Sequence, residues 1–306
     1  MRLYRNLDFA LGERCVLALG CFDGVHAGHA AVLSQARALA NAHSLPLAVF
    51  TFSEPARNFF CHDRIPLILS ENDKTGALCA LGVDITVSLP LCAEILSMSA
   101  QDFVRDIVLG KMRAAHVVCG YNYTFGKGAA GDPALLSEEC GRSAVDVTVV
   151  PEYRCSGKSV SSSALRSAIA NGDVQTANAF LRRPFSISAE VIDGQHLARR
   201  LGFPTVNVIP PAELVIPRRG VYVSRVLFDG KSYFGITNIG VRPTVDVDLL
   251  CAETHIFDFE GDLYGKRIRI EFLHFIREET KFDGIDALSR QVLADIETAK
   301  QYIKGI

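Results

Sequence analysis

Apolar runs of strand length alternate with helical spacing through the first 180 residues of the 306-residue chain. We expect strands at Cys15–Leu19, Leu47–Phe52, Val83–Leu89, His116–Cys119 and Val145–Val150. The stretches between them have helical spacing, as at Gln101–Met112, where Ser99 can cap the helix and Asp102 lies in its first turn. Strands that alternate with helices predict an α/β domain with a parallel, doubly wound sheet. Ligands of such sheets bind beyond the carboxyl ends of the strands.

After about residue 183 the pattern changes to short apolar runs separated by turn signals. These runs predict strands at Ser186–Ile192, Thr205–Val208, Gly220–Phe228, Tyr233–Ile239, Glu253–Phe259 and Arg267–Phe275. Closely spaced strands without helices between them indicate a small antiparallel β-barrel. A charged amphipathic helix at Gly284–Ile303 closes the chain. We therefore expect two domains, 1–182 and 183–306.

Length, charge and cysteine content narrow the class of protein. The chain is long enough for two domains of ordinary size. Its formal net charge of −2 argues against a nucleic-acid partner, which would select a basic face. Nine cysteines without a C-x-x-C pair predict reduced thiols. With no signal sequence and no run of the ~18–20 apolar residues that a membrane span needs, we expect a cytoplasmic protein without a membrane partner. We also expect it to be monomeric or weakly self-associating.

A glycine-rich turn, Gly20-Cys-Phe-Asp-Gly-Val-His-Ala-Gly-His29, follows the first predicted strand. Helical spacing begins directly after it, so His26 and His29 share one face of a helix start. Free backbone N–H groups and the helix dipole favour phosphate there. Two imidazoles can also donate hydrogen bonds to the charge that builds on a phosphorus under attack. A lone histidine in such a loop is usually an ordinary surface residue, but HxGH after a strand resembles the signature of the nucleotidyltransferase superfamily. The candidate nucleotide-binding residues of the turn are Gly20, Phe22, Asp23, Gly24 and Gly28.

Two further segments of the first half carry candidate binding residues. Ser161, Ser162 and Ser163 begin another helical stretch, which they can cap. Alternatively, their hydroxyls hold triphosphate oxygens and Arg166 acts as a cationic clamp. Residues 126–131 match G-x-G-x-x-G, but a dinucleotide fingerprint should follow its strand at once, and Tyr121–Phe125 intervenes. We interpret this segment as a ligand loop, with Asn122 and Lys127 as candidate contacts.

The second half carries two candidate polar positions in predicted strands. Thr205 and Asn207 lie on one face of a strand. Their oxygens suit Mg²⁺ that also binds nucleotide phosphates, although an ordinary strand opening explains them equally well. Glu253 lies in an otherwise apolar strand. It either faces solvent on the barrel or acts as a general base that takes a hydroxyl proton.

Taken together, these segments resemble the prokaryotic bifunctional riboflavin kinase/FMN adenylyltransferases, also called FAD synthetases. The resemblance covers nearly the whole chain. It rests on Phe22–His29, Phe125–Lys127, Ser161–Arg166, Gly202–Asn207, Asn238–Thr244, Glu253–His255 and Gly261–Lys266. It implies a Rossmann-like nucleotidyltransferase domain followed by a β-barrel riboflavin kinase domain.

The resemblance also implies two reactions, whose substrates are riboflavin, FMN and ATP. In the barrel, Thr205 and Asn207 would hold Mg²⁺ with ATP while Glu253 activates a hydroxyl of riboflavin. In the first domain, the FMN phosphate would attack the α-phosphorus of a second ATP. His26 and His29 would stabilise that transition state, while Ser162, Ser163 and Arg166 hold the pyrophosphate. The flavin contacts would be Asn122, Phe125 and Lys127, and FMN and FAD would be substrate and product rather than redox cofactors.

Three positions depart from the family pattern. Cys21 replaces a polar residue, Ala198 replaces a loop glycine, and Pro55 stands where the family has a histidine in Phe-x-Pro-His-Pro-Arg. Loss of one charge-stabilising donor can cost ~10²–10³ in rate, and His62 is a nearby candidate to replace it. Two alternatives therefore remain: a riboflavin kinase with a weakened adenylyltransferase site, and a non-catalytic flavin- or nucleotide-binding regulatory paralogue.

Overall fold

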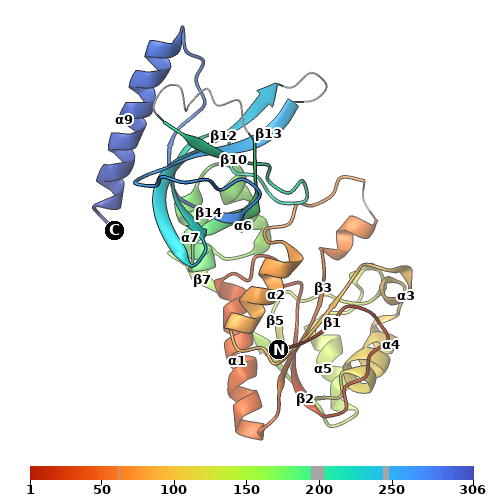
Figure 1. The fold of residues 1–306 in the computed structure, drawn as a ribbon. Coiled ribbons are helices and arrows are strands. Elements are labelled where there is room, and N and C mark those ends of the chain that lie inside the picture. The colour runs from red at the N-terminus through yellow and green to blue at the C-terminus, as the bar shows by residue number, and fades with distance from the viewer. Residues whose placement is uncertain (61, 194–202, 244–247) are drawn as a thin grey trace. The chain divides into compact units, whose positions relative to one another are not determined.

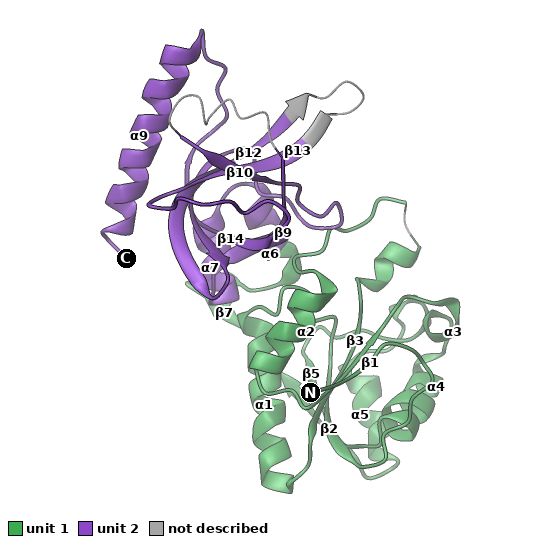
Figure 2. Ribbon diagram, in the orientation of Figure 1, with its two compact units in different colours: residues 1–164 green, residues 165–306 purple. Residues whose placement is uncertain are grey.

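The computed structural model describes residues 1–60, 62–193, 203–243 and 248–306, and Figure 1 traces the order of its elements. The chain divides into two compact units, residues 1–164 and 165–306 (Figure 2), and each is described by itself. A domain boundary near residue 182 stays a prediction. No helix in the described ranges is long and apolar enough to cross a membrane.

The first unit contains a six-stranded parallel sheet. Its strands are β1 (Arg2–Tyr4), β2 (Cys15–Leu19), β3 (Leu47–Phe52), β4 (Ile85–Leu89), β5 (Ala114–Gly120) and β6 (Asp146–Val150). They lie in the order β1-β4-β3-β2-β5-β6. The strands β3 and β4 therefore lie on one side of β2, and β5 and β6 lie on its other side. This order confirms the doubly wound α/β prediction, with β1 as an additional edge strand.

Both faces of this sheet are buried, which explains why its central strand is a continuous apolar run. Leu17 and Leu19 of β2 belong to one apolar cluster, which includes residues of η2 (Phe103–Lys111) and α5 (Pro133–Gly141). Val16 and Ala18 belong to a second cluster, with residues of α1 (Ala27–His43) and α2 (Glu71–Ala80). The shorter elements of the unit are η1 (Ala56–Phe59), α3 (Ala93–Leu96), α4 (Ala100–Asp102), η3 (Lys127–Ala129) and the hairpin β7 (Arg154–Cys155) with β8 (Lys158–Ser159).

The predicted α-helix at Gln101–Met112 differs from the structure in its winding. Only α4 is α-helical, and η2 is a π-helix. Ser99 caps the start as expected, because its Oγ accepts a hydrogen bond from the Asp102 N–H at 3.0 Å. The buried positions of η2 recur in neighbouring pairs, Phe103 with Val104 and Ile107 with Val108. That spacing is compatible with either winding, so the sequence pattern could not distinguish them.

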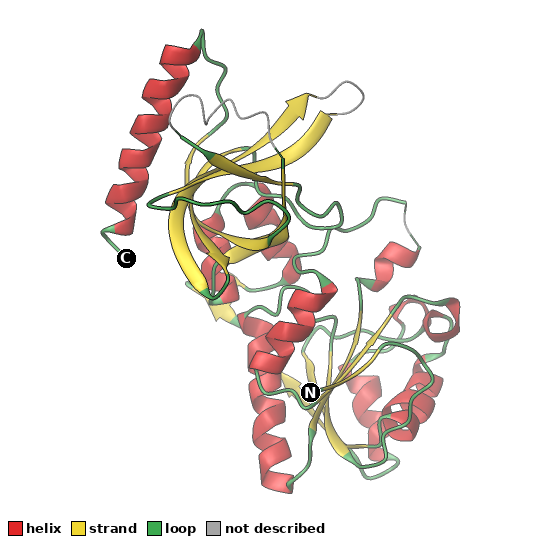
Figure 3. Cartoon of the chain, viewed as in Figure 1, coloured by secondary structure: helices red, strands yellow, loops and turns green. Residues whose placement is uncertain are grey.

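The second unit is built on a closed antiparallel barrel, as predicted (Figure 3). Its strands are β9 (Phe185–Ile192), β10 (Thr205–Val208), β11 (Gly220–Phe228), β12 (Lys231–Pro243), β13 (Asp248–Ile256) and β14 (Arg267–Arg277). The order is β10-β13-β12-β11-β14-β9, and pairing of β9 with β10 closes the barrel. The helices are α6 (Ser162–Ala170), α7 (Val174–Leu181) and α9 (Ile285–Ile303).

Inside and outside faces of the barrel are distinguished by their side chains. The buried hydroxyls of Ser224, Thr237 and Thr254 form a chain of 2.8 Å hydrogen bonds. On the opposite face of β11, Val221 and Val223 pack in one apolar cluster with Ile296 and Ala299 of α9. Residues on this α9-facing side of the strands are therefore outside the barrel.

Candidate active sites

The glycine-rich turn between β2 and α1 has a strained backbone. Phe22 and Val25 have φ values of 51° and 41°, in the left-handed region that side chains disfavour. Such residues cost about 1–3 kcal/mol each and occur where neighbouring structure holds them. Here the Asp23 carboxylate accepts a hydrogen bond from the Ile68 N–H at 3.0 Å, and Thr51 Oγ1 donates to the Cys21 carbonyl at 2.8 Å. Ser162 Oγ donates to the Asp23 carbonyl at 2.9 Å. The turn is thus fixed from three sides.

The two histidines of HxGH lie at the helix start, as their spacing predicts. His26 is the N-cap of α1, and its Nδ1 accepts a hydrogen bond from the His29 N–H at 3.2 Å. The two rings are stacked, with centroids 3.6 Å apart and an interplanar angle of 13°. Burial, together with the charges of His26 and Lys74, holds the pKa of His29 well below its usual range. His29 is therefore a neutral imidazole at neutral pH, with one N–H available as a donor.

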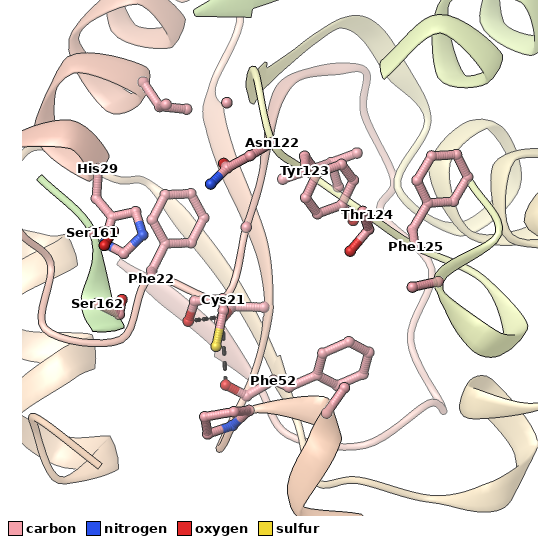
Figure 4. Close-up of a pocket in the computed structure, with 18 of the residues that line it drawn as sticks. Cys21, Phe22, His29, Phe52, Asn122, Tyr123, Thr124, Phe125, Ser161 and Ser162 are labelled. Atoms are coloured by element: carbon pink, nitrogen blue, oxygen red, sulfur yellow. Dashed lines mark hydrogen bonds between the residues drawn. The ribbon is translucent and has the colours of Figure 1, made fainter. Parts of the chain in front are cut away.

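A cavity of about 690 Å³ adjoins this turn (Figure 4). Its size is within the range of small-molecule and cofactor pockets. It is lined by ten of the predicted residues: Gly20, Phe22, His26, Gly28, His29, Asn122, Phe125, Ser161, Ser162 and Ser163. The chain after β5 supplies Asn122 and Phe125, while the start of α6 supplies the serines. Segments distant in the sequence thus meet around one pocket, at the carboxyl end of the sheet.

Four predicted residues of the first half are placed differently. Asp23 is buried and bonded to Ile68, so it supports the turn. Gly24 has a φ of 83°, which the turn requires. The Lys127 side chain is exposed, and neither it nor Asp23 or Gly24 lines the cavity. Arg166 is half-buried on α6, in the second compact unit.

The serine segment and the glycine loop have clear structural roles. Ser161 Oγ accepts a hydrogen bond from the Ala164 N–H at 3.2 Å and so caps α6. In the loop, Phe125 forms a β-bridge with Gly131, and only the short 3-10 helix η3 lies between them. The interpretation as a ligand loop stays a prediction. A Cβ at Gly131 would lie 2.7 Å from the Phe125 ring, and one at Gly126 would lie 2.8 Å from the Ala100 backbone. These glycines allow close packing, so the match to a dinucleotide motif is accidental.

Aromatic residues around the cavity were missed in the sequence. Tyr123 stacks on Phe125 with centroids 5.6 Å apart, and Phe103 lies 5.5 Å from Phe125. Further missed lining residues are Thr51, Phe52, Arg57, Phe60, Tyr121 and Tyr153. A signal was available, because Phe52 ends β3 and Tyr121 directly follows β5 of the parallel sheet.

The departures from the family pattern can also be placed. Cys21 and Pro55 both line the cavity, and Pro55 offers no side-chain donor. His62 is exposed and does not line the cavity, so it does not take the place of the missing histidine. Ala198 lies outside the described residues.

The second candidate site is on the outside of the barrel. The register places Glu253 of β13 opposite both Asn207 of β10 and Asn238 of β12, and His255 opposite Thr205. A cavity of about 270 Å³ is lined by Thr205, Asn238, Glu253, His255, Arg277, Glu279, Phe282 and Asp295, among others. Asn207 is buried and does not line it; the Cys251 thiol donates to its Oδ1 at 3.8 Å. Thr205 and Glu253 thus share one cavity, with Asn207 beside Glu253 in the sheet.

An ion pair at this cavity was not foreseen. The Arg277 guanidinium donates to both carboxylate oxygens of Asp295 on α9, at 2.7 to 3.1 Å. Gln291 donates to the same carboxylate at 3.0 Å, and Phe282 lies under the guanidinium at 5.6 Å. Asp295 is only 2% exposed, so the pair fixes α9 against the barrel where the cavity opens. Charged residues on an amphipathic helix usually face solvent, so this ion pair could not be predicted from the sequence.

The residues of this site fit a hard divalent cation. Thr205 and Asn207 present a hydroxyl and an amide oxygen from one strand, β10, a donor pair suited to Mg²⁺ when phosphates and waters complete its shell. No group of three or more His, Cys, Asp or Glu side chains with metal-binding geometry occurs among the described residues.

A parallel sheet with an HxGH turn, followed by a barrel with its own polar cavity, defines a two-domain nucleotidyltransferase–kinase. Comparison with protein families agrees: residues 9–164 match the FAD synthetase family and residues 181–303 match the riboflavin kinase family. The chain belongs to the bifunctional riboflavin kinase/FMN adenylyltransferase family.

Relatives with that description are similar over nearly the full length. The Escherichia coli (strain K12) protein is 35% identical, over 99% of this chain and 98% of the relative. The Pseudomonas fluorescens protein is 36% identical, over 98% and 97%. A solved structure from Streptococcus pneumoniae, described as a macrolide-efflux protein, has a TM-score of 0.90 and 30% identity, and the match covers 97% of this chain and 98% of that one. That description concerns the streptococcal protein; the family models and curated relatives agree on flavin nucleotide synthesis.

Proposed function

We propose that this chain converts riboflavin to FMN in the barrel unit and FMN to FAD in the first unit, with ATP as donor in both steps. The observation that carries the adenylyl step is the stacked His26–His29 pair at the start of α1, beside a cavity of nucleotide size. There an oxygen of the FMN phosphate attacks the α-phosphorus of ATP, the bond to the β-phosphate breaks, and pyrophosphate leaves.

The residues of the turn and its neighbours then have different roles in adenylyl transfer. His26 and His29 donate hydrogen bonds to the charge on the α-phosphate, and a neutral His29 donates one without the cost of burying a cation. Gly20, Phe22 and Gly28 shape the pocket around the nucleotide, while Ser162, Ser163 and Arg166 hold the departing pyrophosphate. The aromatic side chains near Asn122 and Phe125 provide an apolar surface for the flavin ring.

In the barrel, Glu253 takes the proton of a ribityl hydroxyl, the freed oxygen attacks the γ-phosphorus of ATP, and ADP leaves. Asn207 and Thr205 lie in β10, which pairs with β13, and Asn207 is directly opposite Glu253. They would hold Mg²⁺, which neutralises phosphate charge when bound. Phosphoryl transfer needs mainly positioning and charge neutralisation, and the Arg277–Asp295 pair keeps the cavity wall in place. We place both steps in the cytoplasm, consistent with the free thiols of the described cysteines.

A second candidate, a kinase with a weakened adenylyl site, is favoured by one observation. Pro55 lines the larger cavity where the family resemblance expects a histidine, and no neighbouring histidine of the described chain replaces it. A chromatographic time course with riboflavin, ATP and Mg²⁺, repeated with FMN supplied directly, decides between them. FMN followed by FAD supports the bifunctional assignment. FMN without FAD, even from added FMN, supports the weakened site, and the absence of any product would indicate a regulatory paralogue.

A further inference from the structure

Lys74 on α2 is a buried cation that the adenylyl mechanism does not use. Its side chain is only 2% exposed, and buried lysines are rare unless they are paired. Its Nζ donates hydrogen bonds to the backbone carbonyls of Phe52 and Ser53, the latter at 3.3 Å. Phe52 is the last residue of β3, so Lys74 binds the carboxyl end of that strand. The burial of this charged side chain, with both hydrogen bonds made to one strand end, needs an explanation.

The strand end that Lys74 holds is part of the adenylyl cavity. Phe52 and Pro55 line the cavity, as does Thr51, whose hydroxyl also bonds to the carbonyl of Cys21 in the HxGH turn. The HxGH turn has a second support close to Lys74 in the sequence. The Asp23 carboxylate accepts a hydrogen bond from the N–H of Ile68, just before α2. The segment from Ile68 to Lys74 therefore supports the turn directly and supports it again through β3.

The charge of Lys74 also reaches the reacting groups. Burial lowers the pKa of Lys74, while Cys21, Asp23 and Glu71 raise it. His29 is influenced by Lys74 and by His26, both of which lower its pKa in addition to the effect of burial. A fixed charge at a buried position such as Lys74 is weakly screened and acts on nearby groups.

We propose that Lys74 is a positioning residue for adenylyl transfer, one that holds the end of β3 and, through it, the HxGH turn. This rests on the adenylyl function proposed above. Lys74 does not line the cavity and so touches no substrate. Its effect is on the placement of the turn and on the protonation of His29. The lysine lies in the polar sequence Glu71-Asn-Asp-Lys-Thr75, which on its own reads as a solvated helix start.

Three variants test the proposal in the full-length protein. Lys74→Met removes the charge and both donor bonds, while Lys74→Arg keeps a charge and a donor of different shape. Thr75→Val is the matched control, because Thr75 is also buried on α2 but its hydroxyl bonds only to the carbonyls of Glu71 and Asn72 in its own helix. For each variant we would measure kcat and KM for FAD formation, the riboflavin kinase rate, the melting temperature, and the titration of the His29 ring by NMR without substrate.

We expect Lys74→Met to lower kcat for FAD formation by up to about 100-fold, the scale of a 1 Å misplacement, with the kinase rate within about twofold. Its His29 ring should titrate at higher pH than in the wild type. Lys74→Arg should keep the wild-type His29 titration and lose less activity, and Thr75→Val should match the wild type in both. If Lys74→Met does not fold, Lys74→Arg decides: a lowered kcat for FAD formation with an unaltered His29 titration supports the proposal, whereas wild-type kcat or a shifted titration overturns it.

The proposal is overturned if Lys74→Met has wild-type kcat and His29 titration, or if Thr75→Val reproduces its losses. Failure of the underlying function is a separate outcome. In that case the wild-type protein forms no FAD from FMN, yet the NMR titrations still show whether Lys74 acts on His29.

Discussion

At the scale of single residues, the first site combines a buried His26 and a half-buried His29 with a missing donor. His26 and His29 could be predicted from the sequence because their spacing and the preceding strand fix their position. Lys74 could not, since its burial depends on how α2 packs on the sheet, and a lysine in a polar segment gives no sign of that. Sequence spacing thus predicts side chains within one turn, but not the supports that reach it from other elements.

The low pKa of His29 leads to a prediction about how the free energy of unfolding changes in acid. The unfolded chain binds a proton on this histidine near pH 6.5 and the folded protein does not, so the free energy of unfolding should fall as the pH drops below that value. His29→Gln should lose less stability than the wild type between about pH 7.5 and about pH 5.5, as measured by urea unfolding. His116 and His274, whose pKa values burial also lowers, are unchanged in both proteins. Equal losses would show that His29 titrates normally.

The proline at position 55 leads to a prediction about the rate of FAD formation. Pro55→His places an imidazole donor at the cavity wall, and Pro55 has a φ of −59°, which histidine also adopts without strain. FAD formation from FMN should become faster by about 10-fold or more, in proportion to what one charge-stabilising donor contributes. The riboflavin kinase rate of the same sample is the control. An unchanged or slower FAD rate would mean that this chain does not lack a donor there.

At the scale of elements, the sequence pattern predicted most strands closely. The bounds of β2, β3, β10 and β11 agree with the apolar runs, because strands with a buried face have an unmistakable pattern. The three-residue β1 was missed, since it is short and partly polar. The pairing that places Glu253 opposite Asn207 could not be predicted either, because it depends on how the barrel closes.

The attachment of α9 to the barrel is testable at this scale. Asp295→Ala leaves the Arg277 guanidinium without its buried partner, which should lower the free energy of unfolding by about 3 kcal/mol. It should also raise KM for riboflavin, because both residues line the smaller cavity. Glu297→Ala on the same helix removes only an exposed ion pair and should cost about 0.5 kcal/mol or less. Equal effects of the two changes in urea unfolding would argue that the Arg277–Asp295 pair does not anchor the helix.

At the scale of the whole molecule, the change from alternating strands and helices to closely spaced strands predicted two different architectures in one chain. The sequence could not show which sheet the helices between the two architectures pack on. In the structure α7 packs on β9 and β14, and an apolar helix face does not indicate which sheet covers it. Each unit has its own cavity with its own polar residues. We therefore infer that the two reactions occur at separate sites and share one intermediate, FMN.

The most direct test of this claim is a product chromatogram of two single-site variants, Glu253→Gln and His29→Ala, each given ATP and Mg²⁺ with either riboflavin or FMN. Glu253→Gln should make neither product from riboflavin but should still make FAD from FMN. His29→Ala should accumulate FMN from riboflavin and form little FAD from either substrate. If either variant loses both activities while it remains folded, the two reactions do not occur at separate sites.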